Sequence, residues 1–147
     1  MYKKNPNKFK EIEHTADIGI VCFGNTLAEL FGNAAFGMYQ LLMEDVEIST
    51  SIKKKIQIKE RTLPDLLVAW LSELNYLFVV HNFIACVFNK IHVKQNLEHW
   101  HLEAVLLGDK NNIYKEYCRT EIKAVTYHQL KIEQSAELFT SRIFFDI

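Results

Sequence analysis

The sequence predicts an α+β fold, a two-layer sandwich in which two helices pack on a mostly antiparallel β-sheet. Two segments carry apolar residues at helical spacing, whereas most other segments alternate apolar and polar residues, as half-buried strands do. Several predicted strands follow the second helix through short turns, which favours antiparallel pairing over strand–helix–strand crossovers. These observations indicate one sheet covered by helices on one face.

The first helix is expected over residues 27–43. Thr26 and Glu29 have the spacing of a capping box at its start. Its apolar stripe consists of Leu27, Leu30, Phe31, Ala34, Ala35, Met38, Leu41 and Leu42. This stripe predicts an amphipathic helix that must pack on another element.

The second helix is expected to begin after Thr62. Pro64 and Asp65 fall in its first turn, where a missing N–H and a negative charge both suit a helix start. Its apolar stripe consists of Leu63, Leu66, Leu67, Trp70, Leu71, Leu74, Leu77 and Phe78. Both helices therefore present one apolar face to the predicted sheet.

Strands are expected over residues 18–23, 52–58, 84–93, 97–107, 122–134 and 138–147. The chain has 147 residues, two prolines and five glycines, and shows no repeat or linker. We therefore expect a single domain spanning residues 1–147.

Composition excludes several classes of protein. With 49% hydrophobic and 24% charged residues, the chain is too apolar for a disordered tail. Its formal charge of -1 is not that of a protein that coats nucleic acid through many phosphate contacts. Any role with RNA is therefore expected to be local or indirect.

Targeting and redox signals point to the inside of a cell. The polar, basic start is followed by no apolar segment of a secretion signal, and no stretch approaches the roughly 20 apolar residues of a membrane span. We expect a cytoplasmic protein that contacts no membrane, and a nuclear location is an alternative in a eukaryote.

Cys22, Cys86 and Cys118 are widely spaced without a CxxC motif, so we expect unpaired, mostly buried thiols.

Two carboxylates near the chain ends are candidate metal ligands. Asp17 precedes an apolar strand and Asp146 is next to Ile147 at the other end. A hard cation such as Ca²⁺ takes about 6 to 8 oxygen ligands, and these residues could supply several if the two ends lie on neighbouring strands. The alternative is that Asp17 caps a turn and Asp146 is a solvated residue.

Other polar residues have structural and functional interpretations. Lys123 interrupts a predicted strand. It is either a solvated residue on the outer face of the sheet or a cation that binds a phosphate or a partner's carboxylate. His128 can be a hydrogen-bonded imidazole or a base. His99 and His101 have the HxH spacing of a zinc site, which needs a third protein ligand. The run 53–55 of three lysines is interpreted as a solvated strand edge and not as an RNA patch.

Several blocks of the sequence resemble the archease family. They are EHTADIG at 13–19, TLAELF at 26–31 with NAA at 33–35, PDLLVAWLSEL at 64–74, EIKAVTYH at 121–128 and FDI at 145–147. Because they occur in order across almost the whole chain, chance similarity is improbable.

The resemblance implies a function. Archease-like proteins are metal-binding cofactors of the RNA-splicing ligase that joins tRNA halves, and they promote transfer of guanylate from GTP to that ligase, and so its repeated turnover. The chain is thus expected to be an activator without catalysis of its own, contacting GTP or RNA at most through the ligase.

The resemblance also implies a site. It implies that Asp17, Asp146 and the main chain of Ile147 bind a divalent metal ion. Ca²⁺ is the first candidate, and Mg²⁺ and Mn²⁺ are alternatives. Lys123, His14 and His128 are expected near the partner or its nucleotide.

Two other functions stay open at the level of sequence. One is a metal-dependent hydrolase that uses His99, His101 and an acidic residue. The other is a general chaperone or interaction module without a metal role.

Overall fold

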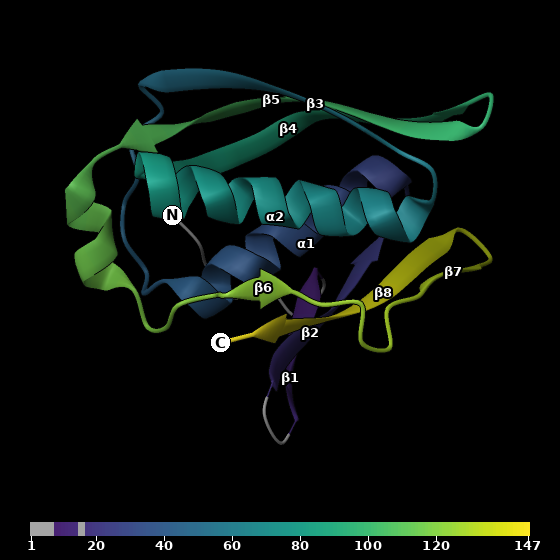
Figure 1. The fold of residues 1–147 in the computed structure, drawn as a ribbon, viewed down its shortest axis with the longest axis horizontal. Coiled ribbons are helices and arrows are strands. Elements are labelled where there is room, and N and C mark those ends of the chain that lie inside the picture. The colour runs from purple at the N-terminus through teal and green to yellow at the C-terminus, as the bar shows by residue number, and fades with distance from the viewer. Residues whose placement is uncertain (1–7, 15–16) are drawn as a thin grey trace.

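The strands form two antiparallel sheets, and the two long helices lie between them (Figure 1). The computed structural model describes residues 8–14 and 17–147, without the side chains of Glu13, His14 and Asn89. The α+β class and the antiparallel pairing are confirmed. The prediction of one sheet in a two-layer sandwich differs from this arrangement, because both helices contact both sheets.

The first sheet joins the two ends of the described chain. Its strands run in the order β1-β2-β8-β6, and β7 also pairs with β8. Their bounds are β1 (Phe9–His14), β2 (Asp17–Gly24), β6 (Ala124–Val125), β7 (Ile132–Ser135) and β8 (Leu138–Asp146). The second sheet has the order β3-β5-β4, with β3 (Ile52–Glu60), β4 (Phe83–Asn96) and β5 (His99–Lys110). A short 3-10 helix, η1 (Asn112–Tyr117), follows β5.

Helix α1 (Leu27–Leu42) is buried around most of its circumference, because one sheet packs on each side of it. Thr26 caps the helix by accepting a hydrogen bond from the Glu29 N–H at 3.1 Å. Asn33, which lies outside the predicted apolar stripe, donates to the Phe23 carbonyl at 2.7 Å and ties the helix to β2. A helix with two buried faces needs a layer on each side.

Helix α2 (Leu63–His81) begins and ends at residues suited to those positions. Thr62 accepts from the Asp65 N–H at 3.1 Å, and Asn82 ends the helix in the left-handed conformation at φ 56°. The Trp70 indole donates to the Phe31 carbonyl of α1 at 2.9 Å.

Helix α2 is long and apolar enough to cross a membrane by length and composition, although the sequence was expected to contain no such stretch. Its apolar stripe packs into the core between the sheets.

Two strand predictions differ from the structure. Strand β1 was not predicted, because its sequence FKEIEH is mostly polar, yet Phe9 is buried against α1. The expected strand over 122–134 is two short strands, β6 and β7, which pair with different parts of β8. Gln129 adopts a positive φ of 53° between them, so the chain turns there instead of continuing as a strand.

The three thiols are unpaired, as predicted. Cys22 is fully buried on the inner face of β2, and burial raises the pKa of its thiol to about 12. Cys86 and Cys118 are half-buried, and burial also raises the pKa of each. Because burial raises the pKa of each thiol, all three cysteines stay protonated near neutral pH.

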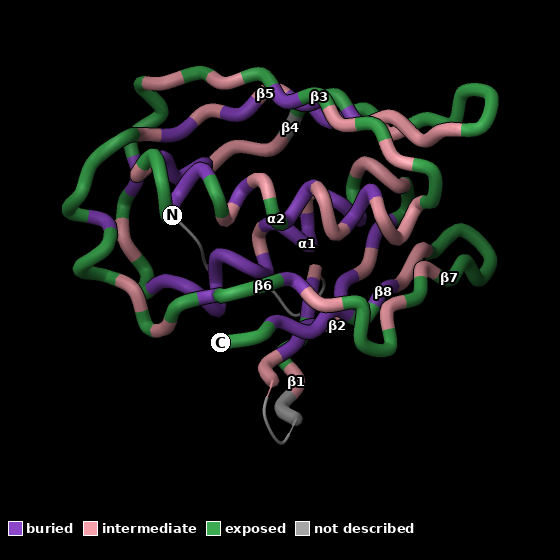
Figure 2. Tube along the Cα trace, in the orientation of Figure 1, coloured by how far each residue is buried: buried purple, intermediate pink, exposed green. Residues whose placement is uncertain are grey.

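Figure 2 shows the buried residues concentrated on the helices and on the strand faces turned toward them.

We predict that Gly108→Ala destabilises the protein by about 2–4 kcal/mol. A Cβ at Gly108 would overlap the Ile84 carbonyl oxygen of β4, so the strand backbone would have to move. The matched control is Gly32→Ala in α1, where a Cβ would come no closer than 3.4 Å to the flexible Ile91 side chain. This control is expected to stabilise the helix by about 0.5–1 kcal/mol. Urea unfolding curves measure both changes, and equal free energies for the two variants would contradict this packing.

Candidate metal and partner site

The pairing of β2 with β8 brings together the two predicted carboxylates. Asp17 lies directly opposite Asp146 in the antiparallel register, and Ala124 of β6 lies opposite Asp146 on its other side. Directly opposed residues have Cα atoms about 4.5–5.5 Å apart. Residues 17 and 146 are separated by almost the whole chain, yet they form one row at the end of the first sheet.

Both carboxylates belong to the outer face of this sheet. Ile18, Ile20 and Phe145 pack toward the helices, and side chains alternate along a strand, so Asp17 and Asp146 belong to the opposite face. Asp17 is half-buried and Asp146 is exposed. Two carboxylates that share a face repel each other unless a cation or proton lies between them.

An aromatic patch adjoins the carboxylates on the same face. Gly19 lies opposite Phe144, and a Cβ at Gly19 would come within 2.8 Å of the Phe144 ring. The His128 ring lies 5.4 Å from that ring, between centroids. The His128 ring therefore lies against the face that carries Asp146. The contribution of Phe144 was missed, although a glycine inside a strand is a signal of close approach.

Lys123 is attached to the site through its backbone. Its N–H donates to the Asp146 carbonyl at 2.8 Å. Lys123 directly precedes β6, and its side chain is exposed. It lines a groove of about 420 Å³ beside α2, together with Ala124, Asn75 and Tyr76. This backbone bond holds Lys123 at the end of the sheet that carries Asp146.

The side chain of His14 lies outside the described part of the structure. Its backbone is opposite Asp17 in the register of β1 and β2. The row of paired positions at the end of the sheet is thus His14, Asp17, Asp146 and Ala124. Ile147 follows β8 directly and is 40% exposed.

The oxygen donors of this site fit a hard divalent cation whose coordination is completed by ligands from outside the chain. Asp17, Asp146 and the main chain of Ile147 supply oxygen, which Ca²⁺, Mg²⁺ and Mn²⁺ prefer. Among the residues whose side chains are described, no three His, Cys, Asp or Glu residues cluster as a metal site. An ion held by this pair would need water or a partner's oxygens to complete its coordination.

The HxH pair does not form the zinc site that the hydrolase alternative requires. The His99 and His101 rings are 6.5 Å apart between centroids, on the second sheet. His101 lies between Lys59 of β3 and Lys94 of β4 in the strand register. Two neighbouring ammonium groups oppose a bound cation, and no third ligand completes the pair within the described part of the chain.

A comparison with known families decides the relationship. Residues 9–147 match the Archease protein family. The chain belongs to the archease family. This match covers every helix and strand of the described structure.

Similar proteins occur in several archaea. The chain is 35% identical over 140 residues to protein archease of Methanosarcina acetivorans, covering 95% of this chain and 96% of that one. It is 31% identical over 140 residues to protein archease of Sulfurisphaera tokodaii, covering 95% and 99%.

Two solved structures share the fold. The solution structure of protein 1598 of Methanobacterium thermoautotrophicum has a TM-score of 0.81 and 25% identity, covering 96% of this chain and 99% of that one. The crystal structure of an archease from Thermotoga maritima, described as a possible chaperone, has a TM-score of 0.55 and 22% identity over 94% and 96%.

Proposed function

We propose that this archease is a metal-binding activator of the RNA-splicing ligase in tRNA splicing, and that it promotes GTP-dependent guanylylation and multiple turnover of that ligase. The observation that carries the proposal is the opposition of Asp17 and Asp146 at the exposed end of a sheet. In this proposal the archease catalyses no reaction by itself, and its partner's active site performs the phosphoryl transfer.

The incomplete donor set supports a shared metal site. Asp17, Asp146 and the main chain of Ile147 would hold one divalent ion, with Ca²⁺ as the first candidate and Mg²⁺ or Mn²⁺ as alternatives. Such an ion neutralises phosphate charge when it is bound. Its remaining coordination positions would be open to water, to ligase side chains or to phosphate oxygens of the ligase's GTP.

Lys123 and His128 would contact the partner next to this metal site. Lys123 offers an ammonium group for a phosphate or a partner carboxylate, and its backbone bond to Asp146 holds the two residues in register. His128 offers an imidazole beside Phe144 on the outer face. The partner would therefore meet cationic and anionic groups within one small area.

A chaperone or interaction role without metal is the second candidate. It is favoured by exposed apolar residues on α2, where Tyr76 is 49%, Val79 41% and Val80 54% exposed along the groove that Lys123 lines. Exposed apolar side chains beside a groove are typical of protein-binding surfaces. This candidate needs no function of Asp17 or Asp146, which separates it from the first.

We predict that Ca²⁺ stabilises the wild-type protein through the carboxylate pair. At about 100 times its dissociation constant, a bound ion adds about 2.7 kcal/mol, or roughly 5–10 °C in melting temperature. Asp17→Asn and Asp146→Asn should lose most of this shift and should be at least as stable as wild type in EDTA, because repulsion is removed. Asp45→Asn, another exposed aspartate, is the control. An unchanged Ca²⁺ shift in either site variant, measured by thermal unfolding, would contradict the proposed ligands.

We predict that Asp17→Ala, Asp146→Ala and Lys123→Ala each lower stimulation of ligase guanylylation by about tenfold or more, as loss of residues at or beside a metal site commonly does. The assay measures labelled guanylate attached to the cognate ligase from GTP, with Ca²⁺, Mg²⁺ or Mn²⁺ in turn. Asp45→Ala and Lys110→Ala are the controls with the same side-chain changes at exposed positions elsewhere.

Two outcomes of this assay would reject the proposal. If the chain does not stimulate the ligase, the partner is wrong. If folded Asp146→Ala stimulates as well as wild type, the metal role is wrong and the chaperone candidate is favoured.

A further inference from the structure

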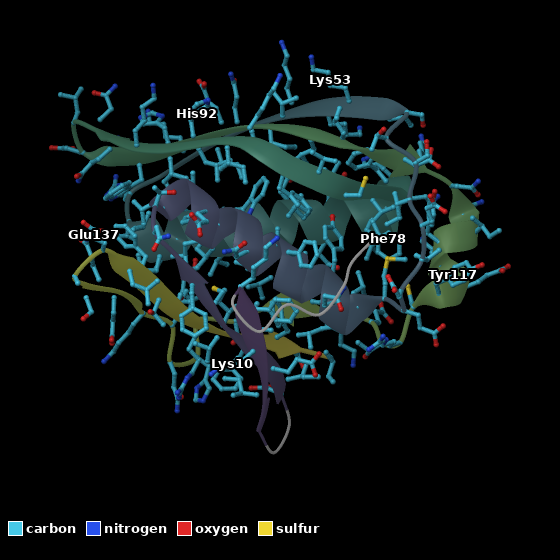
Figure 3. All side chains as sticks on the ribbon, turned by 180° about the vertical axis from the view of Figure 1, so that it is seen from behind. Lys10, Lys53, Phe78, His92, Tyr117 and Glu137 are labelled. Carbon is cyan, nitrogen blue, oxygen red and sulfur yellow. The ribbon has the colours of Figure 1, made fainter. Side chains whose placement is uncertain are left out.

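The outer face of the second sheet carries a concentration of positive charge. The strand register places three lysines of β3 and two of β4 on this face, on either side of the central strand β5. They are Lys53, Lys55, Lys59, Lys90 and Lys94, and all five are exposed. Figure 3 shows Lys53 and His92 on the side of this sheet away from the helices.

The alternation of burial confirms which side chains share this face. Ile56, Leu102 and Ala104 are buried in the core, so their neighbours in sequence point outward. Lys55 lies opposite Val105, and Val105 lies opposite Lys90 on its other side. Lys59, His101 and Lys94 form an equivalent row four residues further along β5, beyond the row of Gln57, Glu103 and His92.

The charge of this face is opposite to that of the rest of the chain. Five of the 17 lysines and arginines lie on it, and its acidic residues among the paired strand positions are Glu103 and Asp109, so the face carries +3. The remainder of the chain carries -4, which gives the total of -1. Lysines two residues apart on one strand are separated by about 7 Å, within the screening length in physiological salt, so they repel one another.

The lysines line the two sides of a shallow polar trough. Strands β3 and β4 are about 10 Å apart across β5. One hollow of about 280 Å³ is lined by Lys55, Lys90, Gln57, His92 and Glu103 among others. A second hollow of about 220 Å³ continues the trough past Lys59 and His101. The central strand thus offers His101, Glu103 and the apolar Val105 between the two rows of lysines, and Gln57 and His92 lie within the rows.

We propose that this trough binds a single strand of RNA. The phosphodiester backbone supplies a regular row of negative charges for the lysines, and contact with them relieves their mutual repulsion. Unpaired bases can stack on imidazole rings and form hydrogen bonds with Gln57 and Glu103 in the trough. A duplex would present its phosphates outward and leave the hydrogen-bonding groups of the trough unused.

An anionic membrane fits the surface less well than a nucleic acid strand. Peripheral membrane binding combines basic residues with apolar side chains that enter the lipid. Most outward side chains that line the trough are charged or polar, with Val105 as an apolar one between Lys55 and Lys90, and Leu97 at the turn between β4 and β5 is 91% exposed. Membrane binding is therefore an alternative outcome of the test and not part of the proposal.

The test measures binding by the archease alone, so it does not depend on the proposed role with the ligase. Fluorescence anisotropy of a labelled oligouridylate of about 20 nucleotides gives the affinity between about 50 and 200 mM salt. If the five lysines each contact a phosphate, the slope of log affinity against log salt is about -3.5. Vesicles of phosphatidylcholine with phosphatidylserine are examined in parallel.

Lys55→Gln/Lys90→Gln should weaken RNA binding roughly tenfold and reduce the salt slope by about 1.4. The matched control, Lys10→Gln/Lys131→Gln, removes the same charge from exposed positions outside this sheet and should bind as wild type does. Glu103→Gln should tighten binding roughly two- to fivefold, because it removes a negative charge from the trough. A gain in affinity cannot result from a failure to fold.

Three results would overturn the proposal. One is equal binding by the Lys55/Lys90 variant and wild type, and another is equal weakening by the two lysine double variants. The third is binding to the anionic vesicles without binding to the RNA, which would assign this face to a membrane.

Discussion

The antiparallel register between β2 and β8 is the constraint on which the candidate site depends. It aligns Asp17 with Asp146 and, through β6, fixes the backbone of Lys123 against the Asp146 carbonyl. A slip of one residue would move either carboxylate to the inner face, among the apolar side chains. The burial of Ile20, Phe145 and their neighbours therefore fixes the geometry of the polar end of the sheet.

The helices between the sheets connect the two charged surfaces without bringing them together. Helix α1 packs against β2 on one side and β4 on the other, so the carboxylate pair and the lysine trough belong to opposite outer layers. This separation lets one small protein present an anionic site for a cation and a cationic face for an anion. A net charge near zero then reflects two opposite local charges, and not a neutral surface.

Local signals in the sequence predicted both helices, because Thr26 and Thr62 cap them and apolar stripes follow. The neighbouring position of Asp17 and Asp146 depends on pairing across almost the whole chain, which spacing alone does not encode. The second sheet was missed because burial on both sides of α1 is a tertiary property. The lysine trough was missed for a similar reason, since β3 and β4 come together only through β5.

The most direct test of the carboxylate site is to locate a paramagnetic ion by NMR. Mn²⁺ is added in small amounts to the isotope-labelled archease, and the broadening of assigned amide signals is measured for wild type and for Asp146→Asn. We predict that signals of residues 17–18, 124 and 146–147 broaden first, and that the substitution abolishes this pattern. Broadening centred on His99 and His101, or an unchanged pattern in Asp146→Asn, would contradict the assignment.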